Sequence, residues 1–115
     1  MASTPRPTTL NNLTIDNQVD TDGTPTLVCR GRITEDTAGL FKAEVKSHAP
    51  GHQYMMADLS EVDFVDSSGL GAVVAAYLSA RSAGCELKLV NVHPRVKDLL
   101  NISRLATMFG EARPS

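Results

Sequence analysis

The sequence has no excess of basic residues and no long apolar run, and each absence excludes a class of protein. Eleven lysines and arginines stand against 13 aspartates and glutamates, so the formal net charge is −2 and the pI is near 5.8. Because no basic field is present to gather phosphate backbones, nucleic acid is not an expected partner. No apolar run reaches membrane-spanning length, and the first residues lack the apolar core of a secretory signal. We therefore expect a cytoplasmic protein that contacts no membrane.

Cysteine is also scarce. Cys29 and Cys85 each lie beside apolar residues in strand-like runs, and we expect buried, reduced thiols rather than a disulfide or a redox pair. The chain has 115 residues, of which 42% are hydrophobic and 21% are charged, as is ordinary for one globular domain. We place that domain at residues 11–109, between flexible tails at 1–10 and 110–115.

The spacing of apolar residues predicts the element order β-β-α-β-α-β-α. Strands are expected at 13–19, 26–30, 53–59 and 86–92, and helices at 34–47, 67–83 and from residue 94, with a last apolar segment at 105–109. Successive β-α-β units imply parallel strands joined by right-handed crossovers. The expected fold class is α/β, with a small mixed, mostly parallel sheet, an N-terminal antiparallel hairpin and packed helices.

Two helices have recognisable ends. Thr34 is expected to cap the first of them, with Glu35 and Asp36 in its first turn. This helix should bury Leu40, Phe41 and Val45. The second helix should end at Gly84 and bury Leu70, Val73, Val74, Tyr77 and Leu78.

The most informative stretch is residues 58–71, DLSEVDFVDSSGLG. It predicts a buried strand that ends in a short acidic turn and leads into a helix whose start holds Ser67, Ser68, Gly69 and Gly71. A helix N-terminus has unpaired N–H groups and a partial positive charge, so a serine there can receive and stabilise a phosphoryl group. Plain N-capping by either serine is the alternative from residue type alone.

The sequence offers little support for a dinucleotide-binding site or for a serine hydrolase. The Gly69-x-Gly71 pair has Val74 where a dinucleotide fingerprint needs its third glycine, and the serines lack the Gly-x-Ser-x-Gly pattern of a hydrolase. We therefore predict no catalytic residue and no cofactor.

A metal site is also not expected. His48 and His52 have no third ligand pattern beside them. Asp58, Asp63 and Asp66 are compatible with a magnesium site, but we favour roles at a strand end, in the turn and at the helix cap, respectively.

From Asp58 to Phe109 the sequence resembles the bacterial anti-sigma-factor antagonists, the free-standing members of the STAS domain family. The matching segments are 58–59, 62–71, 84, 87–91, 94–96 and 99–100, with a weaker match at 31–33 and 37–38. The resemblance implies a non-enzymatic switch. The oligomeric state is left open, with a monomer as the default expectation for the free chain. In that family a serine kinase that is also an anti-sigma factor phosphorylates the residue matching Ser67. The unphosphorylated antagonist binds this kinase and frees a sigma factor, and a serine phosphatase resets the cycle. The alternative is a STAS scaffold or regulatory subunit that never cycles through phosphorylation.

We expect the partner to dock around the start of the second helix. Its contacts should include Thr34, Glu61, Asp63, Asp66, Ser68, Gly69, Leu70 and Gly71. The two glycines would leave the first helical turn bare, so that a partner surface can approach the backbone. The resembling proteins usually have an acidic residue where this chain has Thr34, which predicts slower phosphorylation here than in relatives.

Overall fold

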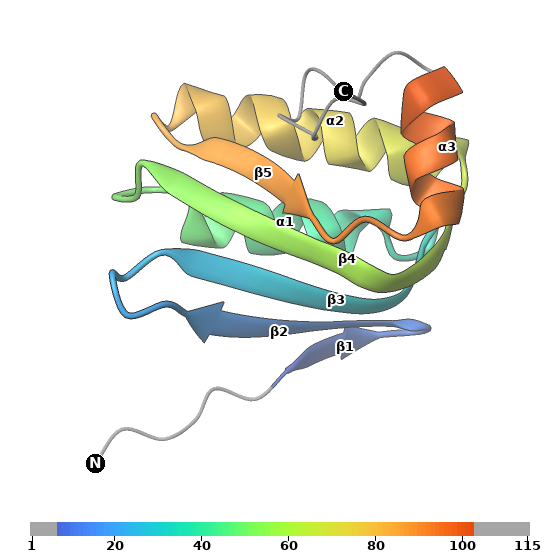
Figure 1. The fold of residues 1–115 in the computed structure, drawn as a ribbon, viewed down its shortest axis with the longest axis horizontal. Coiled ribbons are helices and arrows are strands. Elements are labelled where there is room, and N and C mark those ends of the chain that lie inside the picture. The colour runs from blue at the N-terminus through green and yellow to red at the C-terminus, as the bar shows by residue number, and fades with distance from the viewer. Residues whose placement is uncertain (1–6, 103–115) are drawn as a thin grey trace.

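The computed structural model describes residues 7–102, which form one five-stranded sheet and three helices (Figure 1). The strands are β1 (Thr8–Leu10), β2 (Leu13–Val19), β3 (Pro25–Ile33), β4 (Tyr54–Val65) and β5 (Glu86–Val90), and the helices are α1 (Ala38–His48), α2 (Ser67–Ser82) and α3 (Pro94–Ile102). The strands lie in the order β1-β2-β3-β4-β5. The first three pair antiparallel and the last three parallel, which confirms the predicted mixed α/β fold.

Residues 8–10 were predicted to belong to the N-terminal tail, but they form strand β1. Residues 8–10 pair with β2 through a tight hairpin in which Leu10 lies opposite Leu13. Asn11 in the turn has φ of 52°, a conformation that asparagine tolerates better than most residues. The tail prediction for residues 1–10 is therefore wrong at 8–10. The predicted apolar segment at 105–109 and tail at 110–115 lie outside the described residues.

Strand β4 has 12 residues and extends six residues beyond the predicted end at residue 59, because the expected acidic turn at 60–66 is mostly strand. Its register against β3 slips between Val28 and Arg30 and again between Gly31 and Arg32, so β4 holds one extra residue at each bulge. The bulges keep Leu59, Val62 and Val65 buried at a spacing of three residues instead of two. Figure 1 shows β4 curving toward its carboxyl end, and both bulges lie in that half of the strand.

Helices α1 and α2 cover one face of the sheet and pack against each other, and α3 packs against β4 beside the start of α2 (Figure 1). Helix α1 buries Phe41 and Val45 as predicted, and Leu40 is half-buried. Helix α2 ends at Ser82, and Gly84, two residues later, has a φ of +82°, which confirms the predicted stop. Leu78 was predicted to face the core, but its side chain is 50% exposed. None of the helices within residues 7–102 is long and apolar enough to cross a membrane.

Both cysteines are buried and free, as predicted. Burial, reinforced by the nearby charges of Asp58 and Glu44, raises the pKa of the Cys29 thiol to about 12. Burial also raises the pKa of Cys85. Both thiols therefore stay protonated near neutral pH, where a protonated thiol is a poor nucleophile.

Candidate functional site at the start of helix α2

Two neighbouring parallel strands bring Thr34 and Ser67 to the same edge of the sheet. Ile33, the last residue of β3, is paired with Val65, the last residue of β4. The Asp66 backbone N–H donates to the Ile33 carbonyl at 3.3 Å and joins the two strand ends. Ser67 then opens α2. The predicted proximity of the Thr34 loop and the Ser67 helix therefore follows from the register of these strands.

The Asp66 carboxylate hydrogen-bonds both to the first turn of α2 and to the loop after β3. One oxygen accepts the backbone N–H of Gly69 at 2.7 Å and caps α2, which confirms the capping role predicted for this residue. The other oxygen accepts the backbone N–H of Glu35 at 3.3 Å. A single side chain thus holds the loop after β3 against the first turn of α2.

Both serines beside this cap are exposed. N-capping by a serine, the alternative considered from residue type, does not occur, because Asp66 is the cap and neither serine hydroxyl is hydrogen-bonded to another of residues 7–102. Ser67 is the first helical residue, at the positive end of the α2 dipole. Its hydroxyl is therefore accessible, and a negative charge added there would lie next to unpaired helical N–H groups.

Gly69 is buried against β3, so it contributes to packing within the domain and not to the surface that a partner would contact. It is buried, and a Cβ atom placed on it would lie 1.9 Å from the Ile33 carbonyl oxygen. Only a residue without a side chain lets α2 begin this close to β3. Gly71 is exposed, and a Cβ there would meet nothing within 4 Å. The structure therefore places Gly69 inside and Gly71 outside, with Leu70 half-buried between them.

The loop before α1 is organised differently from the prediction. Thr37, not Thr34, is the N-cap residue of α1, and Glu35 and Asp36 precede the helix. The buried Thr37 hydroxyl donates to the Arg32 carbonyl at 2.9 Å and accepts the Thr34 N–H at 2.8 Å. These bonds turn the chain sharply after β3, so the helix begins three residues later than its capping signal indicated.

Asp36 is one of two acidic residues in this loop, beside Glu35, and its carboxylate makes two side-chain hydrogen bonds. One of its carboxylate oxygens accepts the Thr34 hydroxyl, and the other accepts the Asn11 side-chain amide at 3.1 Å. The β1–β2 turn, the loop after β3 and the start of α2 are thus linked in series by side-chain hydrogen bonds. This link could not be predicted from the sequence, because Asn11 and Asp36 lie 25 residues apart.

Glu61 and Asp63 lie on β4, not in a turn. The Glu61 carboxylate lies 3.4 Å from the Arg30 guanidinium, and the Asp63 carboxylate lies 4.0 Å from that of Arg32. Arg32 also lies over the Phe64 ring at 5.9 Å. These side chains are exposed, so the ion pairs contribute little to stability. Their effect is to leave a mixed, largely neutralised surface on this part of the sheet.

Asp58 has a structural role within β4 rather than at its end. Its carboxylate accepts the backbone N–H of Ser60 at 2.9 Å and the Asn91 side-chain amide at 3.1 Å. Partial burial acts to raise the pKa of Asp58, but the bonds to Ser60 and Asn91 and the charge of Arg30 outweigh it and lower the pKa. Within the described part of the chain, no three histidine, cysteine or acidic side chains gather as metal ligands would.

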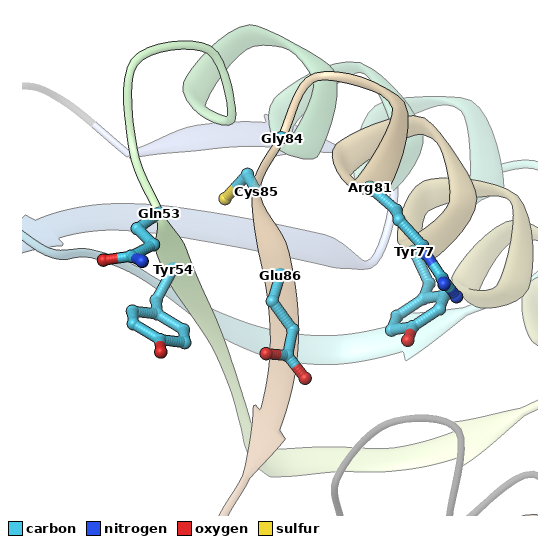
Figure 2. A pocket seen from close by; sticks show the side chains of 7 residues that line it. All are labelled: Gln53, Tyr54, Tyr77, Arg81, Gly84, Cys85 and Glu86. Atoms are coloured by element: carbon cyan, nitrogen blue, oxygen red, sulfur yellow. The ribbon is translucent and has the colours of Figure 1, made fainter.

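A hollow lies at the opposite end of the parallel strands from Ser67, where β4 and β5 begin. It measures about 500 Å³ and is lined by Gln53, Tyr54, Tyr77, Arg81, Gly84, Cys85 and Glu86. Figure 2 shows Tyr77 and Arg81 on the α2 side, Tyr54 on the β4 side and Glu86 between them. Sequence reasoning missed it because its residues come from three separate segments, at 53–54, 77–81 and 84–86. Its position separates it from Ser67.

Comparison with known proteins identifies the family. Residues 17–115 match the model of the STAS domain, and the chain therefore belongs to the STAS domain family. This confirms the family indicated by the sequence.

Solved structures with the same fold include three bacterial proteins. The anti-sigma factor antagonist SpoIIAA of Bacillus, in its unphosphorylated form, has 18% identity and a TM-score of 0.69, over 86% of this chain and 88% of that chain. An anti-sigma factor antagonist from Mycobacterium paratuberculosis has 22% identity and a TM-score of 0.68, over 89% of this chain and 86% of that chain. The Thermotoga maritima protein TM1081 has 23% identity and a TM-score of 0.71, over 97% of this chain and 90% of that chain. At these identities the likeness shows a shared fold.

Proposed function

We propose that this STAS-domain protein is an anti-sigma-factor antagonist that is switched by phosphorylation of Ser67. Unphosphorylated, it binds an anti-sigma serine kinase and releases a sigma factor; phosphorylated, it dissociates, and a serine phosphatase restores it. The observation that carries the proposal is the exposed Ser67 hydroxyl at the start of α2, beside a cap made by Asp66. SpoIIAA, which has the same fold, is known in unphosphorylated and phosphorylated forms. The protein itself needs no catalytic residue, because the kinase and phosphatase supply the chemistry.

The proposed docking surface surrounds Ser67. Thr34, Asp66, Ser68 and Gly71 lie at this edge, and Glu61 and Asp63 extend it along β4. Gly69 and Leu70 act from inside, by setting how closely α2 approaches β3. The turn at 20–24 and the loop at 50–53 lie at the other end of the sheet, away from the proposed surface.

The direct test is to map the phosphate. We expect the anti-sigma kinase encoded in the same genome to add one phosphate, at Ser67, detected by intact mass and located by fragmentation. Ser67→Ala should abolish the modification, whereas Ser68→Ala, which removes the neighbouring exposed hydroxyl, should leave it. Phosphate on Ser68 would contradict the assignment.

The alternative is a STAS scaffold that does not cycle. One observation favours it: the same fold covers only 18% of the chain of the murine anion transporter Slc26a9, with a TM-score of 0.59, so it also occurs as part of a larger protein. A protein that no such kinase phosphorylates, yet which still binds a partner through the Ser67 edge, would support the scaffold.

The loop geometry changes our expectation for Thr34. The neutral threonine suggested slow phosphorylation, but its hydroxyl binds the Asp36 carboxylate, so a negative charge is already present beside it. We propose that Asp36 orients the basic groups of the kinase. Asp36→Asn should then slow phosphorylation about fivefold, equivalent to about 1 kcal/mol in the barrier, whereas Thr34→Asp should not accelerate it, because two carboxylates would repel. The control is Asp22→Asn, the same charge change at the far end of the sheet. A rate increase for Thr34→Asp would contradict the role given to Asp36.

A further inference from the structure

The outward side of α2 has unusual chemistry for an exposed helix. Over its 16 residues α2 has one charged side chain, Arg81, which lines the hollow of Figure 2 on the β5 side. The exposed or half-buried residues elsewhere on the helix are Ser67, Ser68, Leu70, Gly71, Val74, Ala75, Leu78, Ser79 and Ser82. Surface helices normally present charged residues to water, whereas this side of α2 presents only small, apolar and hydroxyl side chains. The face is therefore suited to contact with another surface.

Helix α1 supplies the other wall of a groove on this side. The groove measures about 350 Å³ and is lined by Lys42, Ala43, Lys46, Ala75, Ala76 and Ser79. Its floor is formed by alanines from both helices, and no bulky side chain fills it. Grooves of this kind between packed helices are suited to receive a third helix through its apolar stripe.

The edge of the groove is positively charged. Lys42 and Lys46 lie one turn apart on α1, so they share one side of the helix, and both are exposed. Neither lysine forms an ion pair with any residue between 7 and 102; the nearest acid on the helix, Glu44, is half-buried and lies 4.0 Å from His48. Two unneutralised cations beside an apolar floor select an occupant with acidic residues next to its apolar side chains.

We propose that the α1–α2 groove binds an amphipathic helix of a partner protein, whose apolar stripe packs on Ala43, Ala75 and Ala76 and whose acidic residues pair with Lys42 and Lys46. This inference goes beyond the Ser67 switch. Ala75, the groove residue of α2 nearest to Ser67, lies about 12 Å along the helix from it, at about 1.5 Å per residue. That separation exceeds the Debye length of about 8 Å at physiological salt. A charge added at Ser67 should therefore leave the groove largely unaffected.

Two other occupants match the charges less well. A second copy of the chain docking its own groove would bring the two lysine pairs against each other. Residues 103–115 contain two arginines and one glutamate, so they are net positive and do not complement the lysines. An acidic partner helix is the occupant that the charges favour.

The test uses synthetic helical peptides and the full chain. One peptide has a stripe of leucine and alanine flanked by glutamates, and the matched peptide has lysines in place of the glutamates. We expect the acidic peptide to shift the amide resonances of Ala43, Ala75 and Ser79, and the basic peptide to leave them in place. The double variant Lys42→Glu, Lys46→Glu should bind the acidic peptide at least tenfold more weakly and should now bind the basic one. Lys88→Glu, which reverses a single charge on β5, and Ser67→Asp should bind the acidic peptide as the unaltered protein does.

Several results would overturn the proposal. Equal binding of the two peptides, or resonance shifts confined to other surfaces, would show that the lysines do not select the occupant. Nuclear Overhauser contacts between residues 105–109 and Ala75 in the free chain would assign the groove to the chain itself. A concentration-dependent dimer that Lys42→Glu alters would assign it to a second copy.

Discussion

Replacing Gly69 with alanine should lower the free energy of unfolding by about 3 kcal/mol, near the upper end of overpacking effects. The added Cβ would lie 1.9 Å from the Ile33 carbonyl oxygen, 2.7 Å from its carbon and 3.0 Å from a methyl of Val65. The carbonyl cannot move freely, because it accepts the Asp66 backbone N–H that joins β3 to the start of α2. Relief therefore requires α2 to shift away from the sheet. Urea denaturation followed by circular dichroism measures the loss.

Gly71→Ala is the matched control, on the same helix and two residues away. Its Cβ would enter open space, and alanine is favoured over glycine in a helix by about 1 kcal/mol, so this variant should be more stable than the unaltered protein. The two substitutions should thus act in opposite directions. If both stabilised the protein, α2 would not start as close to β3 as described.

The same pair of glycines shows where sequence reasoning was limited. The sequence indicates that residues 67–71 begin a helix and that glycines relieve crowding there. It cannot show which glycine faces the sheet, because that depends on where β3 ends beneath the helix. The answer came from the pairing of Ile33 with Val65, which joins residues more than 30 positions apart.

Strand β4 was misjudged for a related reason. A strand is recognised by apolar residues at every second position, and residues 55–59 follow that rule. The two bulges then change the spacing of Leu59, Val62 and Val65 to three, and the intervening acids resemble a turn. A bulge depends on the neighbouring strand, so the sequence of β4 alone could not reveal it.

The elements that were predicted correctly have strong local signals. Helix α2 carries a capping aspartate at one end and a glycine stop at the other, and β5 alternates with Leu87 and Leu89 inward. At the start of α1 the predicted cap was Thr34, but the bonds of the Thr37 hydroxyl move the start of the helix three residues along the chain. Local propensity therefore located the elements, and long-range contacts determined their exact ends and the side chains around Ser67.

Ser67→Asp should weaken binding to the anti-sigma kinase by about 30-fold, which corresponds to about 2 kcal/mol. The Ser67 hydroxyl is exposed at the centre of the proposed docking surface, so a bound partner would cover it. A charge covered without a partner of opposite sign loses its hydration, and such losses at interfaces are of order 2–5 kcal/mol. An aspartate carries less charge than a phosphoserine, which has roughly −1.5 to −2, so phosphorylation itself should have the larger effect. Ser67→Ala, which adds no charge, should bind as tightly as the unaltered protein.

The fold should tolerate Ser67→Asp, so a loss of binding by this variant can be attributed to the contact with the kinase. A negative side chain at the first helical position interacts favourably with the α2 dipole, and Asp66 keeps its cap because its bonds go to backbone groups. Ser82→Asp adds the same charge at the exposed far end of α2 and should change the affinity less than twofold. Titration calorimetry at low and high salt separates two causes. Repulsion at a distance would fade as salt rises, whereas the cost of covering the carboxylate would persist. We expect most of the loss to persist, and undiminished binding of Ser67→Asp would show that charge at this serine does not control the partner.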